Sequence, residues 1–331
     1  MRLENFLALT HSTLLNNPCI NNFNDIALKA SKVKRGDLFF AFNKDEIQQA
    51  LNNGAYGIVF DTKVEISDNE IAWMEVQNIN DALKRLLRFK MIEKGIVAYE
   101  CNEIVLKLSL QVATPTNFLS LNGDIKSIFK SLWNIEEKTT VLFCPTIENK
   151  NIFTSIKQLP QTISNNIQTI EQTLFETSFI YDNTYYEREL ISPFFIPYLE
   201  ELLYLYKTLK IDYKLKKFSP IEHFEAVFTN KKFEIKSFGT SDKVLIFESN
   251  TSLIENQILF LQKQAPWANT IFILPHFTKY EADQNTYKYK NENEIIDILK
   301  NTMFNFALIV GVDKSILDKP IINQKQLTLD F

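Results

Sequence analysis

The sequence predicts an α/β fold, with a small N-terminal α/β domain followed by further α/β regions. Short apolar runs rich in Phe, Val and Ile, typical of buried strands, alternate along the chain with stretches of helical periodicity. Apolar residues make up 45% of the chain and charged residues 23%, which is ordinary for a folded protein. Glycine is scarce, at 7 residues in 331, against a usual share of about 7%. The chain therefore has little material for the glycine-rich loops that hold phosphates.

The elements are clearest between residues 20 and 95. An aromatic run after the turn at residues 35–37 predicts a buried strand, and Gly54 and Gly95 mark the expected ends of two helices. Asn43 or Asp45 is expected to cap the first helix and Asn80 the second. Strands are thus predicted at 38–42, 57–60 and 71–76, and helices at 45–51 and 80–95.

The rest of the chain is less regular. Alternation of apolar and polar residues predicts a half-buried strand at 104–112, whereas the polar stretch 161–174 is expected to be a loop or a poorly defined helix. Further strands are predicted at 141–143, 244–247, 270–274 and 308–312, and helices at 125–133, 193–209, 254–264 and 295–299. The length and pattern suggest three domains, at 1–95, 96–250 and 251–331.

Charge and cysteine content exclude several classes of function. The net charge of −4 argues against a general nucleic-acid-binding surface, which would be basic. Cys19, Cys101 and Cys144 are far apart and have no metal-ligand spacing, so neither a metal site nor a disulfide is expected. No apolar run approaches the ~18 residues of a membrane span. We therefore expect a cytoplasmic protein.

Two motifs in the first 60 residues resemble a known family. The segment 33–42 resembles the pattern V-x-P-G-D-L-F-F-A-L, and the segment 49–60 resembles A-x-x-x-G-A-x-G-V-V. Both patterns belong to the N-terminal domain of the Mur ligases, nearest to the branch that adds D-Ala-D-Ala. These ATP-dependent enzymes extend the UDP-muramoyl precursors of peptidoglycan. The resemblance implies a Mur-ligase-like N-terminal domain followed by a reduced Mur-ligase-like central and C-terminal region.

The resemblance also places a nucleotide site at residues 118–127. Binding of ATP requires backbone N–H donors, a lysine beside the γ-phosphate and a Ser or Thr on Mg²⁺. The aligned candidates are Asn122, Gly123, Lys126 and Ser127, but Asp124 stands where the family has its lysine. A carboxylate about 4 Å from the triphosphate would be repelled by about 4 kcal/mol at an effective dielectric near 20. The alternative is a plain turn that caps the following helix.

Other family residues are also absent. An arginine that holds the UDP-sugar is missing beside Ser31, and the loop expected after Phe42 is deleted. His223 stands near the place of a family arginine, and Glu248 remains from an acidic pair. A lone histidine among acids is more often a surface or capping residue than a base or ligand. The sequence therefore predicts no catalytic residues and no metal, with ATP and Mg²⁺ as cofactors only if the chain is an active ligase.

The C-terminus carries a separate motif. Residues 326–331 read Q-L-T-L-D-F, which resembles the peptide by which bacterial proteins bind the DNA polymerase sliding clamp. In this interpretation Leu327, Leu329 and Phe331 enter an apolar groove while Gln326 forms a hydrogen bond at its mouth. The alternative is a final β-strand with Leu327 and Leu329 on its buried face.

Three functions follow as hypotheses. The first is a non-catalytic Mur-ligase-like protein that binds or regulates in peptidoglycan precursor synthesis. The alternatives are a divergent ATP-dependent UDP-muramoyl-peptide ligase and a clamp-associated protein of DNA replication or repair. A protein partner is expected, either a cell-wall enzyme or the sliding clamp.

Overall fold

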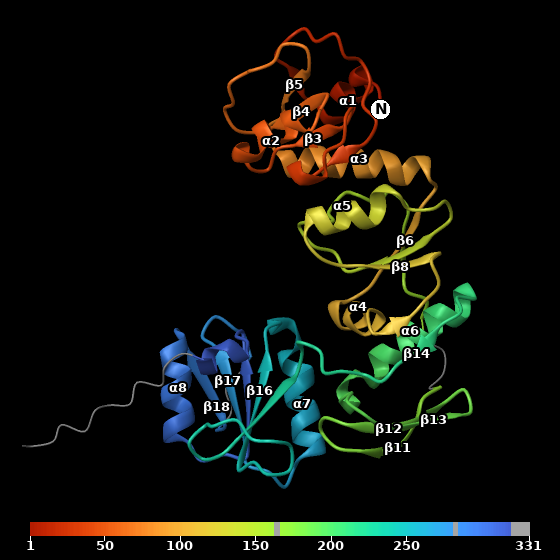
Figure 1. The fold of residues 1–331 in the computed structure, drawn as a ribbon. Helices are drawn as coiled ribbons and strands as arrows, with labels where there is room; N and C mark the ends of the chain where they lie inside the picture. Colours follow the sequence, from red (N-terminus) through yellow and green to blue (C-terminus); the bar gives the residue numbers. More distant parts are fainter. Residues whose placement is uncertain (162–165, 281–283, 319–331) are drawn as a thin grey trace, which may run out of the picture. The chain divides into compact units, whose positions relative to one another are not determined.

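The computed structural model describes residues 1–161, 166–280 and 284–318. The chain forms two compact units: unit 1 comprises residues 1–160 and 205–214, and unit 2 comprises residues 161–204 and 215–331 (Figure 1). Both units mix helices with mainly parallel sheets, which confirms the predicted α/β class. No helix in the described part of the chain is long and apolar enough to cross a membrane.

The first sheet of unit 1 has the strand order β1-β5-β4-β3-β2. Strands β2 to β5 are parallel, whereas β1 pairs with β5 in the antiparallel sense. The strands are β1 Thr13–Leu14, β2 Ile26–Ala27, β3 Leu38–Phe40, β4 Gly57–Phe60 and β5 Ala72–Glu75, and the helices are α1 Leu3–Thr10, α2 Ile47–Asn52 and α3 Ile79–Glu93. The predicted elements of this region are confirmed, except that Asn78 rather than Asn80 caps α3 by accepting the N–H of Asp81.

The second sheet of unit 1 is parallel, with the order β10-β6-β9-β8. Its strands are β6 Val97–Glu100, β8 Phe118–Leu121, β9 Thr140–Phe143 and β10 Ile156–Gln158; helices α4 Glu103–Ser109 and α5 Ile125–Trp133 and the short strand β7 Val112–Ala113 complete this part. The strand predicted at 104–112 is wrong, because α4 occupies most of it. Neighbouring residues Ile104, Val105 and Leu106 are all buried, so the alternation did not mark one buried face.

Unit 2 begins with an antiparallel sheet of β11 Gln168–Gln172, β12 Thr177–Tyr181 and β13 Thr184–Glu189. The loop or helix predicted at 161–174 is therefore corrected to a strand over 168–172, whose five residues are all exposed and gave no apolar signal. The predicted helix at 193–209 is confirmed as a 3₁₀ turn, Pro193–Phe195, followed by α6 Ile196–Leu209, whose residues from 205 onward belong to unit 1. A short strand, β14 Lys214–Leu215, follows α6.

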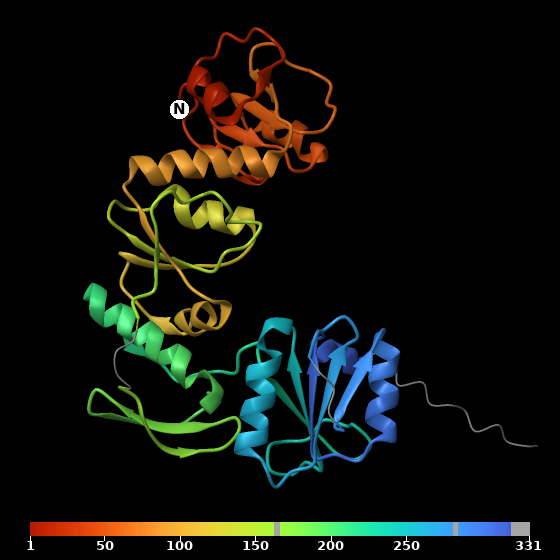
Figure 2. The same cartoon turned by 180° about the vertical axis from the view of Figure 1, so that it is seen from behind.

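The main sheet of unit 2 has the order β15-β16-β19-β17-β18. Its strands are β15 Glu225–Thr229, β16 Lys243–Glu248, β17 Thr270–Pro275, β18 Thr286–Tyr289 and β19 Phe306–Val310. All are parallel except β15. Helices α7 Ile254–Gln264 and α8 Glu292–Asn301 lie on opposite faces of the sheet (Figures 1 and 2). The division expected at residue 250 falls inside this unit, directly after β16.

Candidate functional site

The four residues predicted to bind nucleotide lie in the turn between β8 and α5, which holds Asn122 and Gly123, and in the first turn of α5, which holds Lys126 and Ser127. The carboxylate of Asp124 caps α5 by accepting the N–H of Ser127 at 2.8 Å. Gly123 has a φ of +106°, and a Cβ there would lie 3.1 Å from Ser127 Cβ. The Lys126 ammonium lies 4.1 Å from the centre of the Phe42 ring. The structure thus brings Gly123, Lys126 and Ser127 together with Asn122 in a turn that caps its own helix.

Hydrogen bonds in this turn stabilise the charged form of the Asp124 carboxylate. Hydrogen bonds from the side chain and then the backbone of Ser127, followed by the charges of Lys126 and Lys130, hold the pKa of Asp124 below its usual value. Asp124 is therefore ionised at neutral pH, and it takes an N–H group of the helix N-terminus that an anion would otherwise use.

A second strand-to-helix turn in the same sheet was missed by sequence reasoning. It joins β6 to α4, where Asn102 caps the helix by accepting the N–H of Val105 at 2.9 Å. Burial, and then the carboxylates of Glu103 and Glu100, raise the pKa of the nearby Cys144 thiol. The signal in the sequence was Asn102 placed just before a run of apolar residues, which is typical of a helix start. The carboxyl edge of this sheet thus carries acidic groups and the single glycine of the β8–α5 turn.

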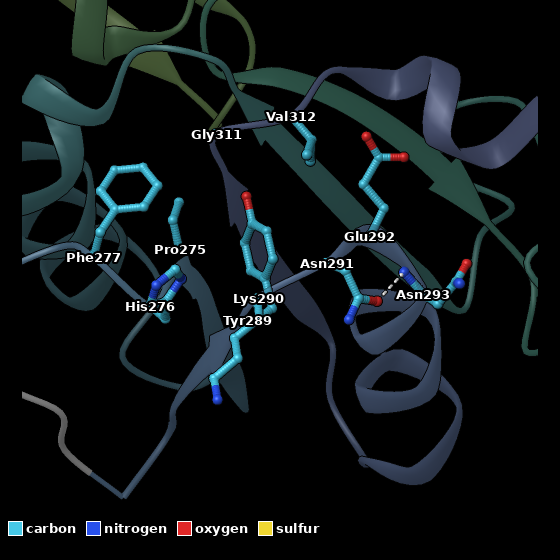
Figure 3. Close-up of a pocket in the computed structure, with 10 residues that line it drawn as sticks. All are labelled: Pro275, His276, Phe277, Tyr289, Lys290, Asn291, Glu292, Asn293, Gly311 and Val312. Carbon is cyan, nitrogen blue, oxygen red and sulfur yellow. Dashed lines mark hydrogen bonds between the residues drawn. The ribbon is translucent and has the colours of Figure 1, made fainter.

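Unit 2 contains a pocket at the carboxyl ends of β17, β18 and β19, with a volume of about 540 Å³ (Figure 3). Figure 3 shows the Tyr289 hydroxyl directed toward Gly311, with His276 and Phe277 on one side and Glu292 on the other. The pocket has both signs of charge and an apolar wall. Its lining residues are Pro275, His276, Phe277, Tyr289, Lys290, Asn291, Glu292, Asn293, Gly311 and Val312.

The floor of this pocket is closely packed. The hydroxyl of Tyr289 donates to the carbonyl of Val310 at 2.7 Å, and burial raises the pKa of Tyr289 to about 12. Gly311 has a φ of +88°, and a Cβ there would lie 2.7 Å from Pro275 Cγ and 2.8 Å from Tyr289 Oη. Glycine is therefore required at this position by both conformation and space.

The N-terminus of α8 borders the pocket but is already capped. Asn291 Oδ1 accepts the N–H groups of Asn293 and Glu294, at 3.1 and 3.3 Å, and Glu294 in turn accepts the N–H of Lys290 at 2.7 Å. The N–H groups of Asn293 and Glu294 are therefore already bonded, and the side chains of His276, Lys290 and Glu292 are ionisable groups that line the pocket.

His223 is buried, not on the surface as expected. Its Nδ1 lies 2.8 Å from Glu248 Oε1, and the two side chains are 1% and 0% exposed. Glu248 also accepts the N–H groups of Phe224 and Asn250 and the side-chain amide of Gln257. The interpretation of His223 as a surface or capping residue is therefore wrong. A separation of 25 residues from Glu248 hid the pair from sequence reasoning.

Comparisons with known proteins identify the fold. No family model matches the chain, and no curated protein matches its sequence. A crystal structure of MurF from Acinetobacter baumannii is similar, with a TM-score of 0.52 and 10% identity, over 93% of this chain and 95% of that chain. The chain therefore has a Mur ligase-like fold, as the N-terminal motifs predicted. Within that class, the structural likeness is to MurF.

Two further structures are similar at lower scores. The MurF ligase from Thermotoga maritima in complex with ADP has a TM-score of 0.49 and 11% identity, over 89% of this chain and 95% of that chain. The UDP-N-acetylmuramoylalanyl-D-glutamyl-2,6-diaminopimelate–D-alanyl-D-alanyl ligase from A. baumannii has a TM-score of 0.48 and 10% identity, over 93% of this chain and 94% of that chain.

Proposed function

We propose that the chain is a non-catalytic protein with a MurF-like fold. Its role would be to bind a precursor or an enzyme of peptidoglycan precursor synthesis, or to regulate that synthesis. The observation that carries this proposal is the carboxyl edge of the second sheet of unit 1. Both helix N-termini there are capped by the chain's own side chains, Asn102 and Asp124. An ionised carboxylate at such a place repels a phosphate by several kcal/mol at a separation near 4 Å.

The remaining residues of the predicted nucleotide site support the same conclusion. Lys126 is the nearest cation by sequence, but its ammonium rests on the Phe42 ring. A triphosphate site needs several converging N–H donors, which a glycine-rich loop supplies because its backbone can approach the phosphates closely. This turn contains one glycine, and the space beside it is occupied by Ser127.

The pocket of Figure 3 supports a binding role for unit 2. Ligands of open parallel sheets bind outside the carboxyl ends of the strands, and about 540 Å³ is ample for a small molecule or a short peptide. His276 and Lys290 suit a carboxylate, and Glu292 suits an ammonium group. We propose that a precursor peptide, or the tail of a cell-wall enzyme, binds there without being ligated.

A ligation assay tests the proposal. The chain is incubated with ATP, Mg²⁺ and the two substrates in the name of the A. baumannii ligase, the UDP-muramoyl tripeptide and D-Ala-D-Ala. Products are measured by mass spectrometry, with A. baumannii MurF as the positive control. We expect no joined product and no ADP. Formation of either would contradict the proposal and favour a divergent ligase.

The terminal motif carries a second candidate function. Residues 326–331 lie outside the described residues, so this candidate rests on the motif Q-L-T-L-D-F alone. We propose that Gln326, Leu327, Leu329 and Phe331 bind the sliding clamp. Removal of residues 326–331 should abolish binding to an immobilised bacterial clamp, whereas Thr328→Ala should leave it unchanged. Equal binding with and without the hexapeptide would rule the function out.

A further inference from the structure

We propose that unit 2 carries a carbohydrate-binding groove at the amino-terminal edge of its main sheet, at the opposite strand ends from the pocket of Figure 3. The groove has a volume of about 500 Å³. Four segments form it: the β11–β12 turn, the β15–β16 loop, the connection from α7 to β17, and the start of β19. Its size lies within the range of about 300–1,000 Å³ found for small-molecule sites.

Exposed aromatic side chains line the groove. Trp267 is 75% exposed and Phe238 is 50% exposed, so both rings present apolar surface to solvent within one groove. Both lie in segments that connect strands, so their exposure is not a consequence of an unpaired sheet face. An aromatic ring presents a flat apolar face, and the C–H groups on one side of a pyranose ring pack on such a face.

Neighbouring rings hold these aromatics in place. Trp267 packs edge-on against Phe306, with ring centres 5.9 Å apart and planes at 73°. Phe238 packs in the same way against Phe228, at 5.1 Å and 90°. Phe228 contacts Phe175 at 5.5 Å and 89°. Rings fixed in this manner lose little conformational entropy when a ligand stacks on them.

The polar groups of the groove are mostly uncharged. Gln172 Nε2 donates to Gln264 Oε1 at 3.1 Å, which leaves the other atom of each amide outside that bond. Asn305 accepts the N–H of Asn269 at 2.9 Å through Oδ1, and its amide NH₂ is not part of that bond. Thr173 and Ser241 add hydroxyls at the wall. Amides and hydroxyls both donate and accept, as sugar hydroxyls do.

Charge decides between possible ligands. Among the described residues that line the groove, Asp242 is the single ionisable side chain, and no lysine or arginine is present. A phosphate or a carboxylate would therefore meet no cation here and would face a carboxylate. A neutral saccharide uses both the aromatic faces and the amides, and Asp242 suits it as an acceptor from two hydroxyls. This inference is independent of the proposed function, because it uses no residue of either site described above.

Calorimetry with two neutral oligosaccharides tests the groove. The full chain is titrated with chitotetraose and with maltotetraose, and binding of either is the expected result. Trp267→Ala should weaken the affinity at least about tenfold, which corresponds to about 1.4 kcal/mol. Gln264→Ala should weaken it as well. The matched control is Tyr185→Ala on β13, an aromatic residue that is 52% exposed and lies outside the groove.

Each result of this titration either supports or overturns the saccharide-binding groove. Loss of binding in the Trp267 variant, with binding retained in the Tyr185 variant and an unchanged urea midpoint in both, supports the groove. Absence of heat with both saccharides overturns it. Equal saccharide binding by the Trp267 variant and the parent chain also overturns it. Binding of the dye anilinonaphthalene sulfonate without saccharide binding would show an apolar surface instead, and would overturn it too.

Discussion

Glu248 shows how single residues of this chain hold the fold. A carboxylate that is 0% exposed needs donors, and His223, Phe224, Asn250 and Gln257 supply them. The sequence drew attention to both His223 and Glu248, but as remnants of separate motifs. Their pairing depends on β16 placing Glu248 beside the segment that leads into β15, which no local pattern records.

Removal of this carboxylate should be costly. We expect Glu248→Ala to lower the free energy of unfolding by about 3–5 kcal/mol, because it leaves several buried donors without an acceptor. The measurement is urea unfolding followed by circular dichroism. Glu255→Ala, an exposed change on α7, is the control. Equal midpoints for the two variants would show that the buried cluster contributes nothing.

Tyr289 allows a prediction about pH. Its pKa is raised to about 12 from the ordinary 10, so the folded state disfavours the phenolate. A raised pKa contributes stability that is complete below pH 10 and is lost as the pH rises toward 12. Tyr289→Phe removes the bond to Val310 and should cost about 1 kcal/mol at neutral pH. The parent chain should lose more stability than the variant between these two pH values, and parallel losses would contradict the assignment.

At the scale of elements, prediction succeeded where a buried apolar run lies between clear turns, and it failed where the pattern of apolar residues did not match the burial. Residues 38–40 and 57–60 are fully buried strands flanked by clear turns, and both were predicted. Helix α4 was taken for a strand because its buried residues Ile104, Leu106 and Leu108 alternate by chance. Strand β11 was missed for the opposite reason, since all of its residues are exposed.

The N-terminal cap of α5 opposes phosphate binding at the β8–α5 turn, because the Asp124 carboxylate occupies an N–H group there. We expect Asp124→Ala to lower stability by about 1 kcal/mol, as for other helix caps. Because the pKa of Asp124 is lowered, this contribution is present above the unfolded value of 3.8 and is lost as the pH falls through the folded value. Unfolding of both chains at pH 7 and at pH 2 is the measurement. A difference in stability that persists at the lower pH would contradict the capping role.

At the scale of the whole molecule, the sequence predicted the class of fold and the Mur ligase likeness. It did not predict which distant strands pair or where the pocket of unit 2 lies. Motifs in the first 60 residues were sufficient for the likeness because glycine, aromatic and spacing features agree there. The pairing of β16 with β19, more than 50 residues later in the chain, could not be predicted from a local pattern. The pocket of Figure 3 was also missed, since its residues come from the ends of three strands that are separate in the sequence.

The few glycines of the chain are unevenly placed between the two sheets of unit 1. Gly36, Gly54 and Gly57 lie in the turns and strand start of the first sheet, where a Cβ would contact Asn24, Arg35 or Phe23. The second sheet of unit 1, which would have to hold a triphosphate, has only Gly123 at its carboxyl edge. Glycine is thus present where packing in the first sheet needs it, and we propose that the second sheet holds no phosphate site.

Calorimetry with Mg-ATP tests this central claim most directly. The full chain is titrated at millimolar nucleotide, beside A. baumannii MurF as a positive control and the Asp124→Ala variant. The account predicts heat for MurF, and none for the parent chain or the variant, since removal of the carboxylate restores neither a lysine nor a glycine-rich loop. One-to-one binding of Mg-ATP by the parent chain with a submillimolar dissociation constant would contradict it.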